Sequence, residues 1–368
     1  MSIVATSTGL KLAGARDLGP QFVQNHDRMV GQDGAFSIRL DDAETLWFFG
    51  DTLIGTRPAD HSIWLIDGRL PGHADMSGLG TYERMINNTG LILPKQTGRN
   101  GLKDFRYIQD AQGQMKCLIP HEGDEHPDWD RIWCQHGICL GDKVYLSFIK
   151  VRMLVESGPL PIWFRVAGSG LAVGRRGEWN FERILQDGRS VLWREHEPHF
   201  GTAFLDNPQD GHVYVYGTVS LKGLHQCYLA CVRADEIDKP DRYKYLAGPE
   251  PTWSRSIHEA IGIFDRMPSE LSVSYNKFLG RFLAVHSLDL SGKIVGRTAP
   301  HPWGPWSDPV VLWTARAEHK HPRPYPNDLI YAAKEHPTLA AEDGRVIYLT
   351  YIEFEEYFPH LIEVTLAS

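Results

Sequence analysis

The chain has 368 residues and a formal net charge of −8, so an extended basic surface for binding nucleic acid is not expected. No apolar run approaches the roughly 20 residues of a membrane-spanning helix, and no membrane partner is expected either. Glycine (35 residues), proline (23) and aromatic residues are abundant, which favours many short strands joined by turns. The sequence carries no indication of an oligomeric state.

The N-terminal stretch MSIVATSTGLKL lacks the basic and apolar regions of a secretion signal. We therefore expect a cytoplasmic protein, or a secreted or periplasmic one whose signal has been removed. The five cysteines are odd in number and form no Cys-x-x-Cys pair, so reduced, buried thiols are expected.

Five segments share one pattern: a polar residue, a short strand, a turn containing Asp, Gly or Asn, and a more apolar strand. The copies are QDGAFSIRLDDAETLWFFGDT from Gln32, QHGICLGDKVYLSFIKV from Gln135, HFGTAFLDNPQDGHVYVYGTVS from His199, ELSVSYNKFLGRFLAVHSLDL from Glu270 and EHPTLAAEDGRVIYLTYIEF from Glu335. From the second copy onward they recur about every 65 residues, which suits a four-stranded blade with long loops. The step from the first copy to the second is longer, and we expect the additional residues in Thr56–Asn88. Helical signal is weak, with one turn expected in 234–246.

The sequence therefore predicts an all-β fold, a five-bladed β-propeller with four-stranded antiparallel blades around a central channel. We expect a single domain over residues 1–368, because no segment resembles a linker. The blades are expected to start near the first residue of each copy.

Residues at the same phase of each repeat should converge on one rim of the channel. This phase holds an ionisable residue in all five copies, namely Asp33, His136, His199, Glu270 and His336. First-strand starts are usually small or apolar, so we expect these residues to form a site.

Asp51 should join this site through the first hairpin. The turn at 41–44 folds strand 45–50 onto strand 34–40, so Asp33 and Asp51 should emerge at the same edge, about 5–8 Å apart. Two close carboxylates do not both ionise readily, and one protonated acid beside one carboxylate is what glycoside hydrolysis requires. The alternative is that each Asp only caps its turn.

The three histidines have three interpretations. They bind sugar hydroxyls, they hold a metal ion such as calcium in the channel, or one of them transfers protons near neutral pH. Asn88 is a candidate for binding a substrate hydroxyl. Several aromatic side chains are candidates for stacking on sugar rings: Trp129, Trp133, Trp303, Trp306 and Tyr357.

A set of motifs in a fixed order resembles a known family. The motifs are DGAFSIRLDDAETLWFFGDTLIG, NNTGLIL, YLACVRADEIDKPDRYKYLAG, GPWSDPVVLW and EHPTLAAEDGRVIYLTYIEF. Together they resemble a bacterial family of five-bladed propellers, long catalogued as a domain of unknown function, that includes endo-D-arabinanases. The resemblance runs from about Gln32 to the C-terminus. It implies a glycosidase whose carboxylates come from the first blade, here Asp33 and Asp51.

Three functions follow from these patterns. The first is a glycoside hydrolase acting on a poly- or oligosaccharide, with an arabinan-type furanoside as one candidate. It uses Asp33 and Asp51 as acid and nucleophile or base, with Glu270 as pKa modulator or alternative acid, and requires no cofactor. The second is a polysaccharide lyase in which His136, His199 or a tyrosine removes the proton next to a uronate carboxylate. The third is a propeller that binds glycans without catalysis.

Overall fold

The computed structural model describes residues 9–57, 63, 82–154, 163–221, 223–317 and 328–367. Within these ranges the regular structure is strand, apart from short 3-10 turns, so the all-β prediction is confirmed. The 3-10 turns are η2 (Ala234–Glu236), η3 (Pro240–Arg242), η4 (Ile257–Glu259), η5 (Pro337–Leu339) and η6 (Glu342–Gly344). Among the described helical turns, none has the length and apolar character needed to cross a bilayer.

The described strands form five larger sheets and one small sheet. The first sheet holds β3 (Phe36–Arg39), β4 (Glu44–Phe49), β7 (Thr89–Pro94) and β8 (Arg106–Tyr107). The second holds β9 (Asp130–Leu140), β10 (Lys143–Met153), β11 (Phe164–Arg175), β12 (Glu182–Arg183) and β13 (Trp193–Arg194). The third holds β14 (His199–Asn207), β15 (His212–Leu221), β16 (Leu224–Arg233), β17 (Lys244–Gly248), β18 (Thr252–Ser254) and β19 (Gly262–Asp265).

The fourth sheet consists of consecutive strands, the fifth also includes the N-terminal strand, and the small sheet is formed by strands that precede and follow the β3–β4 hairpin. The fourth holds β20 (Leu271–Asn276), β21 (Arg281–Ser287), β22 (Lys293–Ala299) and β23 (Val310–Thr314). The fifth holds β24 (Ile330–Glu335), β25 (Val346–Glu353), β26 (Pro359–Ala367) and β1 (Lys11–Pro20). The small sheet holds β2 (Met29–Gln32), β5 (Thr52–Gly55) and β6 (Tyr82–Ile86).

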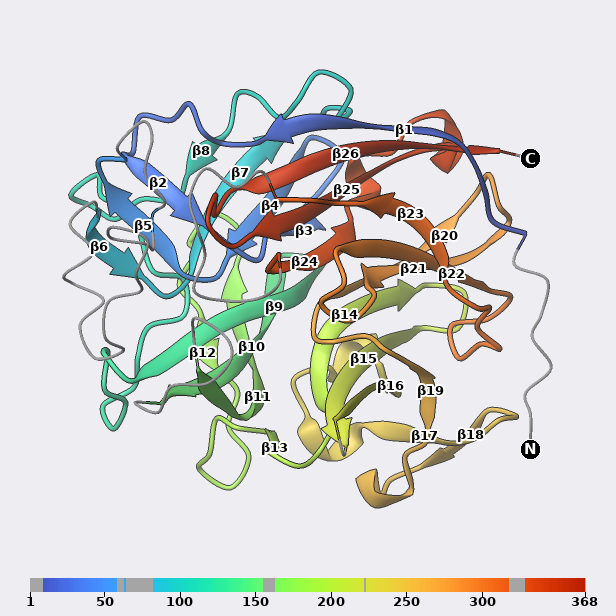
Figure 1. Cartoon of the computed structure of the whole chain (residues 1–368). Helices are drawn as coiled ribbons and strands as arrows, with labels where there is room; N and C mark the ends of the chain where they lie inside the picture. The colour runs from blue at the N-terminus through green and yellow to red at the C-terminus, as the bar shows by residue number, and fades with distance from the viewer. Residues whose placement is uncertain are drawn as a thin grey trace.

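The first strands of the five larger sheets contact one another in succession. β3 contacts β9, β9 contacts β14, β14 contacts β20, and β20 contacts β24. The fifth sheet returns to the first where Ser37 Oγ of β3 lies 2.7 Å from His336 Nδ1, directly after β24. In Figure 1 the chain accordingly passes from sheet to sheet around the molecule, from blue through green, yellow and orange to red.

The apolar core lies between the faces of adjacent sheets, and strand β4 shows why. Its side chains alternate between the two faces of the first sheet, as strand geometry requires. Phe48 belongs to a buried cluster with Phe148 of the second sheet, whereas Trp47 belongs to one with Tyr348 of the fifth. An apolar run such as LWFF is therefore needed because both faces of the strand are covered.

The N-terminal strand completes the last sheet. β1 pairs antiparallel with β26, and Figure 1 shows blue β1 alongside red β26. Arg16 Nε lies 2.7 Å from Glu363 Oε1 across this pair. His360 of β26 is ion-paired with Asp17 of β1 (3.4 Å) and with Glu356. This strand pair ties together the two ends of the described chain.

The charge of His360 should contribute to stability in a pH-dependent way. Although burial alone would lower it, the two carboxylates raise the pKa of His360 to about 9. Because the folded-state pKa is raised, the stabilisation is complete below the usual histidine pKa and is lost as the pH rises through about 9. We expect His360→Gln to lower the free energy of unfolding by about 1–2 kcal/mol at about pH 6 and by much less at about pH 10. Chemical denaturation across this pH range measures it.

The matched control is His212→Gln, because the ion pair of His212 with Asp210 is more exposed. This variant should lower the free energy of unfolding only slightly, and by a similar amount at both pH values. An equal loss of stability for His360→Gln at both pH values would contradict the charge-based explanation and indicate lost packing instead.

The last repeat starts earlier than its sequence pattern predicts. The first strand of the fifth sheet is β24, which ends at Glu335, whereas the predicted start lay near Glu335. The residues expected to form that strand instead form η5 and the connection to β25, because Pro337 begins a helical turn. The expected turn within 234–246 is confirmed as η2 and η3. All five cysteines are free, as expected, but only Cys134, Cys227 and Cys231 are buried, whereas Cys117 and Cys139 are partly exposed.

Candidate active site

The first hairpin brings Asp33 and Asp51 to one edge of the first sheet, as the sequence predicts. Strands β3 and β4 pair with Phe36 opposite Phe48, and the Gly50 N–H donates to the Asp33 carbonyl oxygen at 3.0 Å. Asp33 therefore lies opposite Gly50, and Asp51 follows directly. Between Asp33 and β3 the chain turns sharply, with positive φ at Gly34 (83°) and Ala35 (54°). This turn sets Asp33 apart from the regular strand.

Asp33 is a half-buried carboxyl group whose protonated form is favoured. Burial, reinforced by the charges of Asp51 and Glu270, raises the pKa of Asp33 to about 8. The hydroxyls of Tyr331 and Tyr357 act in the opposite sense, and Tyr331 donates to Asp33 Oδ2 at 3.2 Å. Asp33 is thus a carboxylic acid that still carries its proton at neutral pH.

Asp51 is more buried, yet it ionises more readily. Burial raises its pKa to about 6, while Arg131, the Trp133 indole and His121 favour the charged form. Arg131 Nε lies 3.8 Å from Asp51 Oδ2, and the Arg131 side chain is itself buried. Asp51 Oδ1 has no hydrogen-bond partner among the described residues. At neutral pH the pair therefore combines a protonated Asp33 with an ionised Asp51.

Glu270 lies on the Asp33 side of the pair and brings a third carboxylate to the site. Its charge contributes to the raised pKa of Asp33, and it accepts a hydrogen bond from Ser269 Oγ at 2.5 Å. Lys334 connects the same groups. Burial lowers the pKa of Lys334 to about 7, whereas Glu270 and Asp33 favour its charge. Its ammonium group donates to the carbonyl oxygens of Gly34 and Ala332.

The three predicted histidines occupy three different environments. His199 lines a cavity that Ser269, the neighbour of Glu270, also lines. His136 lines a different, larger cavity of about 820 Å³ that extends to the β3–β4 turn, at the other end of β3 from Asp33. His336 is fully buried, stacks on Trp47 with ring centroids 4.1 Å apart, and bonds to Thr350 Oγ1 at 2.7 Å. The expected convergence of all five phase residues is therefore wrong.

Strand register explains this difference. Three of the five first strands, β9, β14 and β24, contain residues that are left out of the ladder, for example where β9 faces the stretch between Leu146 and Phe148 of β10. In the fifth sheet Tyr331 pairs with Ile352, three residues before Lys334 pairs with Thr350. Asp33 likewise lies three residues before Phe36, where the ladder of the first sheet begins. A sequence repeat read without these bulges is shifted by several residues.

Asn88 is fully buried and its amide binds the backbone. It donates to the carbonyl oxygens of Ile119 (3.0 Å) and Ile132 (2.9 Å) and accepts from the Ile119 N–H (2.7 Å). These bonds join the start of β7 to the segment that leads into the second sheet. Both polar atoms of the Asn88 side chain are therefore bonded to the backbone, which indicates a structural role and not the predicted binding of a substrate hydroxyl.

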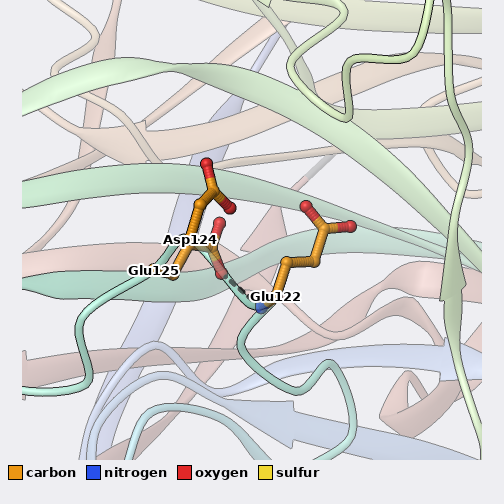
Figure 2. Close-up of side chains that lie close together, drawn as sticks. All are labelled: Glu122, Asp124 and Glu125. Carbon is orange, nitrogen blue, oxygen red and sulfur yellow. Dashed lines mark hydrogen bonds between the residues drawn. The ribbon is translucent and has the colours of Figure 1, made fainter.

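One group of acidic side chains within the described ranges lies close enough to share a metal ion, and Figure 2 shows it: Glu122, Asp124 and Glu125. Glu125 is already paired with Arg183 (2.7 Å) and Lys150 (2.8 Å). These cations hold the pKa of Glu125 at about 2 despite its burial. The group is therefore an ion-pair network that anchors this loop to the second sheet, and nothing in its contacts indicates a metal.

Several residues of the site could not be predicted from the repeated hairpin pattern of the sequence. Tyr331, Arg131 and Lys334 come from the fifth and second sheets and reach the two aspartates only in the folded protein. Aligning the last repeat on DLIYAAKEH would have placed Tyr331 at the phase of Asp33. Trp133 and Tyr357, which the sequence offers as sugar-stacking aromatics, do adjoin the pair.

Comparisons with known proteins agree with this fold. The family described as a domain of unknown function, DUF4185, matches residues 20–363. No match was found among curated proteins. A Bacteroides ovatus protein described as a candidate hydrolase has a TM-score of 0.61 and 17% identity over 95% of this chain and 87% of that chain.

Two further solved structures cover most of both chains with a TM-score of 0.49. An endo-arabinase from Bacteroides thetaiotaomicron is 9% identical over 94% of this chain and 98% of that chain. Zg3597, a family 117 glycoside hydrolase from Zobellia galactanivorans, is 10% identical over 98% of this chain and 92% of that chain.

Proposed function

The chain belongs to the DUF4185 family, and we propose that it is a glycoside hydrolase with Asp33 and Asp51 as its catalytic pair. The observation that carries the proposal is the placement of two carboxyl groups at one edge of the first sheet, with Asp33 opposite Gly50 and Asp51 directly after it. Their surroundings differ: Asp33 accepts from Tyr331, Arg131 lies beside Asp51, and the pKa of Asp33 is raised further than that of Asp51. Glycoside hydrolysis needs one carboxylic acid and one carboxylate on either side of the scissile bond.

Each residue then has a distinct role in the reaction. Asp33 donates its proton to the leaving glycosidic oxygen, which requires the protonated form that its surroundings favour. Asp51 is the carboxylate, acting on the anomeric carbon directly or through water, and Arg131 keeps it ionised. Glu270 raises the pKa of Asp33 by its charge. The two carboxyl groups supply the proton and the base, so the reaction as proposed requires no cofactor.

We further propose that the five larger sheets are the five blades of a propeller forming a single domain. The succession of first-strand contacts supports this, as does the closing pair β1–β26. In such a fold the starts of the first strands share one rim of the channel, where a carbohydrate chain has room to bind.

A glycan panel tests the function directly. The protein is incubated with neutral and acidic poly- and oligosaccharides, beginning with arabinan-type furanosides, and the products are identified by mass spectrometry. New reducing ends without an unsaturated uronate chromophore support hydrolysis. A uronate chromophore would instead indicate a lyase, and no cleavage of any glycan would reject the proposal.

The pH dependence of kcat/KM should be bell-shaped. Activity should rise as Asp51 loses its proton near pH 6 and fall as Asp33 loses its proton near pH 8. Because the two groups interact, these limbs belong to the pair as a whole. Initial rates at low substrate concentration measure the profile. A flat profile between about pH 5 and 9 would contradict the assignment of these two groups.

A further inference from the structure

A cleft between the second and third sheets adjoins the candidate active site. Its volume is about 280 Å³, and its lining includes Arg165, Gln135, His199, Thr202, His225 and Ser269. Ser269 also donates to Glu270 at 2.5 Å, so the cleft and the carboxylate site share a wall. None of the cleft residues takes part in the chemistry proposed above.

Two partly buried histidines of the cleft, His199 and His225, are uncharged at neutral pH. Burial lowers the pKa of His199 and of His225 below the usual histidine value, so both imidazoles are neutral. His199 Nε2 is buried and has no hydrogen-bond partner in the described part of the chain. A buried ring nitrogen without a partner is unfavourable, and a ligand hydroxyl would satisfy it.

The guanidinium that lines the cleft already has a carboxylate beside it. Arg165 lies at the rim with its Nε 3.7 Å from Glu195 Oε1, and both residues line the cleft. A uronate, sulfate or phosphate group would require an unpaired cation at this place. Hydroxyl, amide and neutral imidazole groups suit the hydroxyls of an uncharged sugar.

We propose that this cleft is a subsite for one or two sugar units next to the unit that is cleaved, and that the substrate is an uncharged glycan. The volume lies near the lower end of the roughly 300–1,000 Å³ of small-molecule sites, which fits one or two units. The inference rests on the proposed hydrolase function for its position beside the cleaved bond. It also makes a lyase substrate unfavourable, because a uronate would have to compete with Glu195 for Arg165.

Binding to a catalytically inactive protein tests the subsite. The Asp33→Asn protein is titrated by calorimetry with neutral oligosaccharides of increasing length, and with uronate-containing oligosaccharides of the same lengths. Affinity should increase with each unit that reaches the cleft and should be higher for the neutral series. Adding His225→Ala to this protein should weaken its binding of the longer neutral oligosaccharides about tenfold. His258→Ala serves as the matched control, because His258 is exposed on the turn η4, which connects β18 and β19 of the third sheet.

His199→Gln provides a second test if His225→Ala lowers the melting temperature. Length-independent binding, tighter binding of the uronate series, or unchanged affinity in both histidine variants overturns the subsite. Cleavage by the native protein separates the two proposals. If the glycans bind as expected but none is cleaved, the hydrolase proposal fails and the subsite stands. If they are cleaved with the same KM in both histidine variants, the subsite fails and the hydrolase proposal stands.

Discussion

Replacing Asp33 with asparagine should lower kcat for glycan hydrolysis by roughly 10²–10⁴-fold, the usual contribution of a general acid. Asparagine matches the shape and the neutral charge of the protonated carboxyl group and can still bind Tyr331. It has no proton to transfer to the leaving group. Rates on a substrate identified by the panel measure the loss, and substrates with a good leaving group should be affected least.

The same variant should be more stable than the native protein above about pH 4. The raised pKa means that the folded state holds the proton more tightly than the unfolded state. The resulting destabilisation is absent below the unfolded pKa, increases with pH and is complete above about pH 8. We therefore expect Asp33→Asn to raise the melting temperature above that of the native protein, and to raise it more at pH 7 than at pH 4. A drop in both stability and activity would indicate a structural role.

An exposed aspartate provides the control for this substitution. Asp128 has a largely exposed side chain near His126, and Asp128→Asn should change neither kcat nor the pH dependence of stability. Full activity of Asp33→Asn would remove Asp33 from the reaction and leave Glu270 as the remaining candidate acid.

Gly50→Ala should reduce kcat by about 10²-fold, because it displaces the Asp33 carboxyl group. A methyl group on Gly50 would lie less than 3.0 Å from Asp33 Oδ1, a separation that real side chains do not adopt. The backbone of Gly50 is not in the left-handed region, so alanine is tolerated there and the side chain of Asp33 has to move. Steady-state kinetics should show a lower kcat and a shifted alkaline limb of the pH profile.

Gly123→Ala is the matched control for this change. A methyl group at Gly123 would meet nothing within 4 Å, and its backbone is likewise not in the left-handed region. This variant should keep native rates. Native rates in Gly50→Ala would show that the position of Asp33 beside Gly50 is irrelevant to catalysis.

The sequence alone determined the local part of the site. The turn residues at 41–44 and the alternating residues of β3 and β4 specify one hairpin register, and this register places Asp33 and Asp51 at one edge. The apolar run of β4 likewise indicates a strand covered on both faces. Both features depend on neighbours within about 20 residues, so no knowledge of the remaining chain was needed.

Only the tertiary structure decided which other residues reach the aspartates. Tyr331 and Arg131 approach the pair from sheets that are distant in sequence, and His336 is enclosed in the wall beside Trp47. Bulges in the first strands β9, β14 and β24 shift the register of their sheets by a residue or more, and a single sequence carries no clear sign of them. The pKa difference between the two aspartates is also tertiary in origin, because it arises from burial and from charges on other sheets.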